Sequence, residues 1–183
     1  LAYYDLRNRL SSATDEELLS FIETYSSIPL SYRIRTQWLY RLAEDQRWKQ
    51  YLKVYKQQGG AKLRCAYLHA RLATDKARKT YKSVMLSTKK LWVVGKKQPA
   101  ECDYVFSKFE KSKYISTQLI WDRIENAIKK GNTKLALDLS KKLGSRDRKQ
   151  VELWVKVHKN PGKYLKSKKL RKRSLVNRKI IIH

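Results

Sequence analysis

The chain has 183 residues, of which 43 are lysine or arginine and 16 are aspartate or glutamate, so its formal net charge is +27. A content of 42% hydrophobic and 11% aromatic residues is enough to form a core, which excludes a basic disordered tail. Every apolar run is too short to cross a bilayer, and the length suits one domain or an elongated array of small units. The start at Leu1, without a methionine or a leader pattern, indicates a processed or trimmed chain.

The positive charge is unevenly distributed along the sequence. Residues 1–50 contain seven acids and seven bases, whereas residues 51–100 contain thirteen bases and one acid. Residues 101–150 contain twelve bases and seven acids, and residues 151–183 contain eleven bases and one acid. Such an excess indicates either an acidic partner or lysines that cover the solvent-facing sides of helices.

Apolar residues recur at helical spacing from the N-terminal part of the chain onward. The first such stripe consists of Leu18, Phe21, Ile22 and Tyr25. Thr14 precedes this stripe and Glu17 stands three residues after Thr14, which is the pattern of a capping box. The sequence therefore predicts a capped helix that begins near residue 15.

The same spacing continues along the chain. Three further stripes consist of Trp48, Tyr51, Leu52 and Tyr55; of Leu63, Ala66, Tyr67 and Ala70; and of Ala77, Thr80, Tyr81 and Val84. Three later ones consist of Ile120, Ile124, Ala127 and Ile128, closed by Gly131-Asn132; of Leu135, Leu139 and Leu143, closed by Gly144; and of Val151, Trp154, Val155 and His158. Only Lys179 to His183 resemble a strand.

The second helices of successive pairs start near residues 15, 47, 75 and 132, a spacing of about 30 residues or twice that. Short amphipathic helices bury their apolar stripes by stacking on their neighbours. We therefore predict an all-α fold, an α-solenoid or superhelix of short antiparallel helix pairs, with a compact helical bundle as the alternative. The superhelical domain is expected over residues 1–165 and a basic C-terminal segment over residues 166–183.

Motifs that carry chemistry are scarce in this sequence. Cys65 and Cys102 have no metal-ligand spacing, and the residues alone leave a disulfide and two buried thiols equally open. The three histidines have no Asp or Cys partner at motif spacing, and no glycine pattern matches a phosphate loop. We expect no catalytic residue, no metal site and no cofactor.

Tryptophans and the basic tail suggest contacts with a polymer. Trp48 and Trp154 lie on helical stripes and are expected in the core, whereas Trp92, close to Lys96 and Lys97, is a candidate for stacking on a sugar or base. Residues 166–173 resemble a nucleic-acid-binding patch, although a solvated helix end has the same composition.

The segment from Leu91 to Phe106 resembles the N-terminal superhelical region of the soluble lytic murein transglycosylases. The matching elements are Leu91-Trp92, Gly95-Lys96, Gln98-Pro99, Cys102-Asp103 and Phe106. Further elements in the same order are the helix pair from Leu42-Ala43 to Trp48, Cys65 with Tyr67, Arg123-Ile124, Ala127, Lys129 and Gly131-Asn132-Thr133. The resemblance covers residues 1–145.

This resemblance implies a periplasmic, ring-like or U-shaped α-superhelix that leads, in the family, into a lysozyme-like domain. That domain cleaves the MurNAc–GlcNAc bond of peptidoglycan to a 1,6-anhydro product and is marked by Glu-Ser, Gly-Leu-Met-Gln and Asn-Ala-Gly motifs. None of these motifs occurs in this sequence. The resemblance thus implies a non-catalytic part of the superhelix that is not an enzyme by itself. It also implies a disulfide between Cys65 and Cys102, which suits the oxidising periplasm.

We expect this chain to act as a scaffold and to offer a basic surface to peptidoglycan, whose stem-peptide carboxylates are anionic. A catalytic domain is the expected covalent partner if the parent protein has one. The predicted ligand-binding residues are Lys62, Arg64, Trp92, Lys96, Lys97 and Lys129. The alternative is a basic α-solenoid that binds nucleic acid, with an affinity that falls steeply with salt, or a protein partner.

Overall fold

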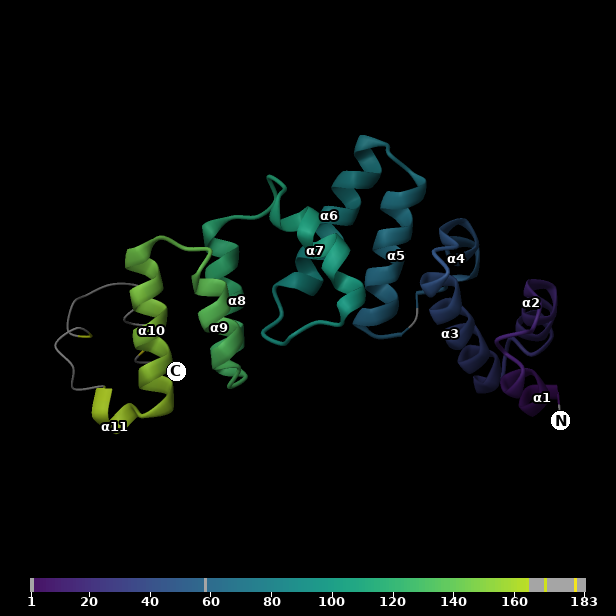
Figure 1. Ribbon diagram of the computed structural model, residues 1–183, viewed down its shortest axis with the longest axis horizontal. Helices are drawn as coiled ribbons and strands as arrows, with labels where there is room; N and C mark the ends of the chain where they lie inside the picture. Colours follow the sequence, from purple (N-terminus) through teal and green to yellow (C-terminus); the bar gives the residue numbers. More distant parts are fainter. Residues whose placement is uncertain (1, 58, 165–169, 171–179, 181–183) are drawn as a thin grey trace. The chain divides into compact units, whose positions relative to one another are not determined.

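The computed structural model describes residues 2–57, 59–164, 170 and 180 (Figure 1). Over these residues the chain forms eleven α-helices and one 3-10 helix, with no strand, which confirms the all-α prediction. The chain divides into two compact units, which are described separately. Unit 1 consists of Leu1–Thr88 and Pro99–Lys108, and unit 2 consists of Lys89–Gln98 and Phe109–His183.

Unit 1 is built from consecutive helices that pack on one another. Its elements are α1 (Ala2–Asn8), α2 (Asp15–Thr24), α3 (Pro29–Glu44), α4 (Trp48–Val54), α5 (Ala61–Thr74), most of α6 (Arg78–Trp92), η1 (Ala100–Cys102) and most of α7 (Asp103–Glu110). Helix α3 contacts both α2 and α4, and α5 contacts both α4 and η1. This nearest-neighbour packing agrees with the predicted chain of helix pairs.

Helix α2 begins where the capping pattern predicts. The Thr14 hydroxyl accepts a hydrogen bond from the Glu17 backbone N–H at 3.2 Å, and the Glu17 carboxylate accepts one from the Thr14 backbone N–H at 2.8 Å. The next residue, Asp15, accepts a hydrogen bond from the indole N–H of Trp38 in α3 at 3.2 Å. An N-cap of this kind contributes about 1 kcal/mol, and Asp15 also ties the start of α2 to its neighbour.

The core of unit 1 is formed by the inward-facing stripes of α2 to α5. Its fully buried members include Leu18, Ile34, Trp38, Leu39, Leu42, Tyr51 and Leu63. The hydroxyl of Tyr51 donates a hydrogen bond to the carbonyl oxygen of Leu63 at 2.8 Å, which links α4 to α5. Burial raises the pKa of Tyr51 above its ordinary value, so this phenol stays protonated and remains a donor.

Unit 2 continues with the end of α6, the end of α7, α8 (Thr117–Lys129), α9 (Thr133–Ser140), α10 (Ser145–Lys159) and α11 (Pro161–Tyr164). Helix α9 contacts both α8 and α10. Gly131 has a φ of +70°, which confirms the predicted left-handed stop after α8. The predicted stop at Gly144 is wrong, because α9 ends at Ser140 and Gly144 is an extended residue that begins α10.

The connection after α6 lies directly against α8. A Cβ atom on Gly95 would lie 2.0 Å from the backbone oxygen of Asn126 and 2.4 Å from the backbone nitrogen of Ala127. Only glycine allows two backbones to approach this closely. The side-chain amide of Asn126 donates a hydrogen bond to the carbonyl oxygen of Val93 at 3.0 Å and fixes the contact.

The predicted boundary at residue 165 and the basic segment 166–183 lie outside the described residues, apart from residues 170 and 180. Leu170 and Ile180 are both buried, and Ile180 has a helical backbone rather than the strand expected there. Within the described residues, no helix combines the length and the apolar character that a membrane crossing requires.

Candidate functional site

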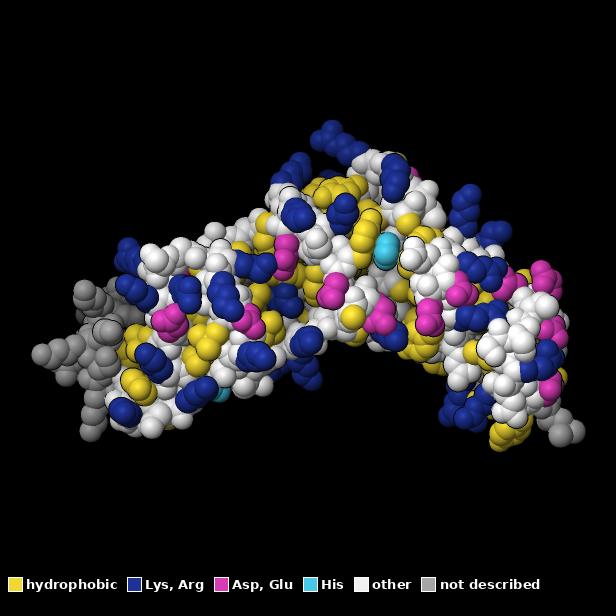
Figure 2. All heavy atoms as spheres, in the orientation of Figure 1, with side chains coloured by type: hydrophobic (Ala, Val, Ile, Leu, Met, Phe, Trp, Pro, Cys, Tyr) yellow, Lys and Arg dark blue, Asp and Glu magenta, His cyan; other side chains and the backbone are white. Residues whose placement is uncertain are grey.

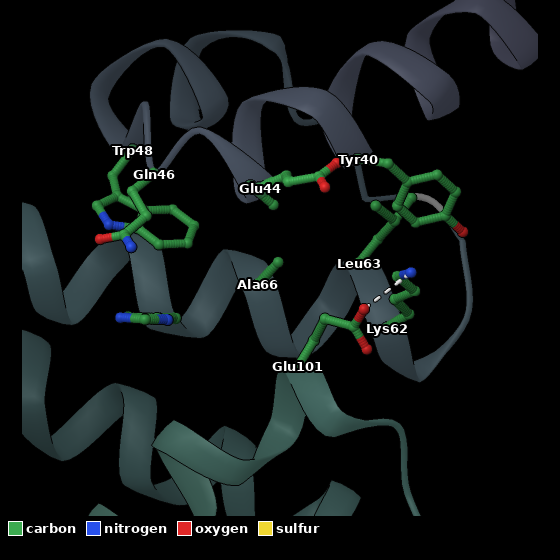
Figure 3. A pocket seen from close by; sticks show the side chains of 10 residues that line it. Tyr40, Glu44, Gln46, Trp48, Lys62, Leu63, Ala66 and Glu101 are labelled. Atoms are coloured by element: carbon green, nitrogen blue, oxygen red, sulfur yellow. Dashed lines mark ion pairs between the residues drawn. The ribbon is translucent and has the colours of Figure 1, made fainter.

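A cavity of about 400 Å³ lies in unit 1 between α3, α4, α5 and η1 (Figure 3). Its lining residues are Tyr40, Ala43, Glu44, Gln46, Trp48, Lys62, Leu63, Ala66, His69 and Glu101. Figure 3 shows Gln46 and Trp48 at one end and Tyr40, Lys62 and Glu101 at the other. A volume of this size falls within the range of small-ligand pockets.

The charged end of the cavity is organised by Lys62. Its Nζ atom lies 2.8 Å from Oε1 of Glu101 and 4.7 Å from the centre of the Tyr40 ring. The hydrogen bond to Glu101 raises the pKa of Lys62 above its ordinary value, which keeps the ammonium group charged. Both side chains remain partly exposed, so the ion pair itself contributes less than about 1 kcal/mol to stability.

Three aromatic rings pack together at the other end of the cavity. The ring centres of Trp48 and His69 are 4.4 Å apart, and those of His69 and Tyr104 are 3.7 Å apart in a stacked arrangement. His69 is half-buried, and burial lowers its pKa below the ordinary value. The imidazole is therefore neutral at pH 7 and acts as the middle layer of the stack.

A disulfide between Cys65 and Cys102 joins α5 to η1, as the family resemblance implies. Both residues are fully buried. Lys62 precedes Cys65 by about one helical turn, and Glu101 directly precedes Cys102. The bridge thus holds the backbones that carry the two charged partners next to each other.

The other predicted ligand-binding residues do not line this cavity. Arg64 is exposed on α5 in unit 1, whereas Lys96 and Lys97 are exposed in the connection after α6, in unit 2. Lys129 on α8 forms an ion pair with Glu125 at 2.9 Å. Among the predicted residues, only Lys62 contributes to the cavity.

Trp92 is a core residue rather than a platform for a ligand. Its side chain is fully buried, and its indole N–H donates a hydrogen bond to Oε1 of Glu110 at 3.0 Å. The guanidinium carbon of Arg123 lies 4.4 Å from the ring centre and covers one part of it. This burial removes Trp92 from the set of residues that could stack on a sugar or base.

Most of the residues that line the cavity were not predicted as site residues. Tyr40 and Glu44 lie on α3, a helix that none of the predicted stripes covers. Trp48 was expected to lie in the core, but it is only half-buried. Gln46 has a φ of 54°, which is the left-handed region that usually favours glycine. Because the residue is not a glycine, the sequence gives no sign of this turn. Across the described part of the chain, no group of three His, Cys, Asp or Glu side chains is placed to hold a metal ion.

Charge differs between the regions of the visible face. In Figure 2, carboxylate side chains gather in unit 1 around α3 and η1, whereas lysines and arginines predominate over α8 to α10. The cavity is therefore set in the less basic part of the protein, in agreement with the balanced charge of residues 1–50.

Curated relatives identify the enzyme family that this chain matches. The soluble lytic murein transglycosylases of Escherichia coli (strain K12) and Salmonella typhimurium are each 25% identical to it over 141 residues. The aligned region covers 76% of this chain and 21% of each relative. The chain thus spans about a fifth of the length of these relatives.

Solved structures match nearly the whole chain. The inactive mutant of the lytic transglycosylase Slt from Pseudomonas aeruginosa superposes with a TM-score of 0.83 at 26% identity, over 98% of this chain and 29% of that one. The 70-kDa soluble lytic transglycosylase of Escherichia coli gives a TM-score of 0.78 at 22% identity, over 97% of this chain and 28% of that one. The second similarity shows the fold alone.

One comparison disagrees with these. A family model described as Cucumovirus coat protein matches residues 78–180. Viral capsid domains are commonly two-sheet jelly rolls, whereas the described residues of this stretch are helical and contain no strand. The all-helical fold agrees instead with the Pseudomonas aeruginosa enzyme, whose match covers 98% of the chain in three dimensions. This chain therefore resembles, in its sequence and in its all-helical fold, a part of the soluble lytic murein transglycosylases.

Proposed function

We propose that this chain is a non-catalytic part of a periplasmic lytic transglycosylase, in which it acts as a scaffold and presents basic side chains to peptidoglycan. The observation that carries the proposal is the match of 98% of this chain to 29% of the Pseudomonas aeruginosa enzyme. The parent protein would cleave the MurNAc–GlcNAc bond of peptidoglycan through a domain that carries the catalytic motifs. The Cys65–Cys102 disulfide supports the oxidising periplasm as the compartment.

The basic residues differ in how much attraction they offer to an anionic polymer. Lys62 and Lys129 are each paired with a carboxylate, so part of their charge is already neutralised. Arg64, Lys96 and Lys97 are exposed and form no ion pair with a described residue. We therefore assign the stronger role to these last three, which attract stem-peptide carboxylates through weak, salt-sensitive contacts.

Sedimentation with purified sacculi tests this proposal. The bound fraction of the chain should fall steeply as NaCl rises from about 50 to about 300 mM, because the Debye length shrinks over this range. Sacculi whose carboxylates have been amidated should bind much less chain at low salt. Absence of salt-dependent binding would remove the polymer contact and leave the scaffold role.

Charge-matched variants make the assay specific. The triple variant Arg64→Gln, Lys96→Gln, Lys97→Gln should bind less, whereas Arg7→Gln, Arg33→Gln, Lys49→Gln should bind like the unmodified chain. All six residues are exposed, and both variants lose three positive charges. Equal losses in the two variants would mean that net charge alone drives binding. Such binding would not distinguish peptidoglycan from nucleic acid.

A further inference from the structure

The cavity in unit 1 has the wrong charge for an anionic polymer. Its rim carries two carboxylates, Glu44 and Glu101, and one ammonium group, that of Lys62. The remaining lining side chains are uncharged, since the His69 imidazole is neutral at pH 7. A chain with a net charge of +27 therefore contains a cavity with a surplus negative charge, which favours a cationic ligand.

Lys62 shows how the charged end of the cavity holds an ammonium group. Its Nζ atom is held by the Glu101 carboxylate at 2.8 Å and lies 4.7 Å from the centre of the Tyr40 ring. Carboxylates and the faces of aromatic rings both bind alkylammonium ions in proteins. The Lys62 side chain is 49% exposed, so it can turn into solvent and release both partners.

Glu44 provides a second carboxylate on the opposite wall. Figure 3 shows it on α3, across the cavity from Lys62 and Glu101. Its charge contributes to the raised pKa of Lys62, but Glu44 forms no ion pair with Lys62, whose partner is Glu101, or with another described residue. Its negative charge is thus available to a ligand even while Lys62 occupies the Glu101 carboxylate.

The aromatic end suits the aliphatic part of such a ligand. Trp48 and His69 form a wall whose ring centres are 4.4 Å apart. Ala66 lies between this wall and the charged end, where Leu63 adds a further apolar side chain. The volume of about 400 Å³ is large enough for a linear diamine or a lysine side chain.

We propose that this cavity binds an aliphatic primary ammonium group, carried by a small amine or by a lysine-like side chain of a peptide. Glu44 and Glu101 are the carboxylate partners of the ammonium group and Tyr40 is its aromatic partner, whereas Trp48 contacts the aliphatic part of the ligand. This site is independent of the proposed peptidoglycan surface, because it uses carboxylates and none of Arg64, Lys96 and Lys97.

Titration of the ¹⁵N-labelled full chain tests the site, with the indole N–H signal of Trp48 as the readout. 1,5-Diaminopentane should shift this signal with a dissociation constant on the order of 1 mM. The uncharged 1,5-pentanediol, which has the same length, should not. A lysine peptide and its Nε-acetyl form provide the second pair. If the lysine peptide binds more tightly than the diamine, the ligand is a lysine-like side chain. If the diamine binds more tightly, the ligand is a free amine. Either result supports the site.

Three single variants test whether the cavity binds cations, as proposed, or anions. Glu44→Gln and Glu101→Gln should each weaken diamine binding by about fivefold, because each removes a charged acceptor. Lys62→Gln should tighten it by about threefold, because it removes the internal competitor for Glu101. Glu23→Gln on α2, an exposed carboxylate outside the cavity, is the matched control and should change nothing.

The reverse pattern would overturn the proposal. A site for anions would lose affinity in Lys62→Gln, and a purely apolar pocket would bind the diol as well as the diamine. Unchanged binding in Glu44→Gln would likewise reject it. These outcomes are distinct from a failed sedimentation assay, which depends on different residues, and circular dichroism of each variant verifies the fold.

Discussion

Within unit 2, the indole N–H of Trp92 donates a hydrogen bond to Oε1 of Glu110 at 3.0 Å. The other carboxylate oxygen of Glu110 accepts a hydrogen bond from Nζ of Lys142 at 2.7 Å. Burial tends to raise the pKa of Glu110, but the hydrogen bonds from Lys142 and Trp92 outweigh it and lower the pKa below its ordinary value. Burial lowers the pKa of the neighbouring Arg123 to about 10, and that guanidinium lies over the Trp92 ring.

The substitution Glu110→Gln should lower the free energy of unfolding by about 1–2 kcal/mol at pH 7, because it removes the charged acceptor of two hydrogen bonds. Since the pKa of Glu110 is lowered by folding, its contribution is present above the ordinary carboxyl pKa and is lost as pH falls through the folded value. Urea unfolding at pH 7 and pH 3 should therefore show a difference between variant and parent that shrinks in acid. Glu152→Gln, on an exposed ion pair of α10, should stay within about 0.5 kcal/mol of the parent at both pH values.

Removal of the disulfide should destabilise unit 1. The bridge spans a sequence separation of 37 residues, for which loop-closure entropy predicts up to about 4 kcal/mol. The double substitution Cys65→Ala, Cys102→Ala should shift the urea midpoint accordingly, and reductant should affect only the parent. Equal masses after denaturation and alkylation with and without reductant would show that the bridge is absent.

The substitution Gly95→Ala should be severe. Its Cβ atom would lie 2.0–2.4 Å from backbone atoms of Asn126 and Ala127, and backbone cannot move aside as a flexible side chain can. We expect a loss of roughly 3–5 kcal/mol in the free energy of unfolding. Gly162→Ala is the matched control, because nothing lies within 4 Å of its added methyl group. Similar melting temperatures for the two variants would contradict the close contact.

His69 should make unit 1 sensitive to mild acid. Because burial lowers its pKa in the folded chain, stability is fully present above the ordinary histidine value and decreases as pH falls below it. Between pH 7 and pH 5 the parent should lose more stability than His69→Phe, which retains a ring between Trp48 and Tyr104 but does not titrate. Parallel pH profiles of the two urea midpoints would argue against this role.

Local signals predicted the parts of the fold that depend on neighbours in sequence. Thr14 and Glu17 form the capping box because both partners lie within one helical turn, and Gly131 ends α8 because its own φ is positive. Helix α3 was not predicted as a separate stripe. Ile34, Trp38 and Leu42 recur at four-residue spacing on its inward face, but Ser31 and Arg35 also occupy buried positions there. Gly144 was misassigned because an extended glycine that begins a helix looks the same in sequence as one that ends a helix.

Only separate parts of the candidate site were predictable from the sequence. The resemblance implied the Cys65–Cys102 bridge, and Lys62 was predicted as a basic ligand-binding residue, but no spacing connects them to Glu44 and Trp48 across the cavity. Trp92 was assigned to ligand binding because lysines follow it in sequence. Its burial depends instead on Glu110 and Arg123, which no spacing in the sequence connects to it.

The disulfide also determines what a protease can release from this chain. The exposed Lys96 and Lys97 lie in the connection between α6 and η1, inside the segment that the Cys65–Cys102 bridge encloses. A cut after either lysine opens the backbone but leaves the two pieces joined through sulfur. A nicked chain would therefore keep its full mass on a non-reducing gel and separate into fragments only after reduction.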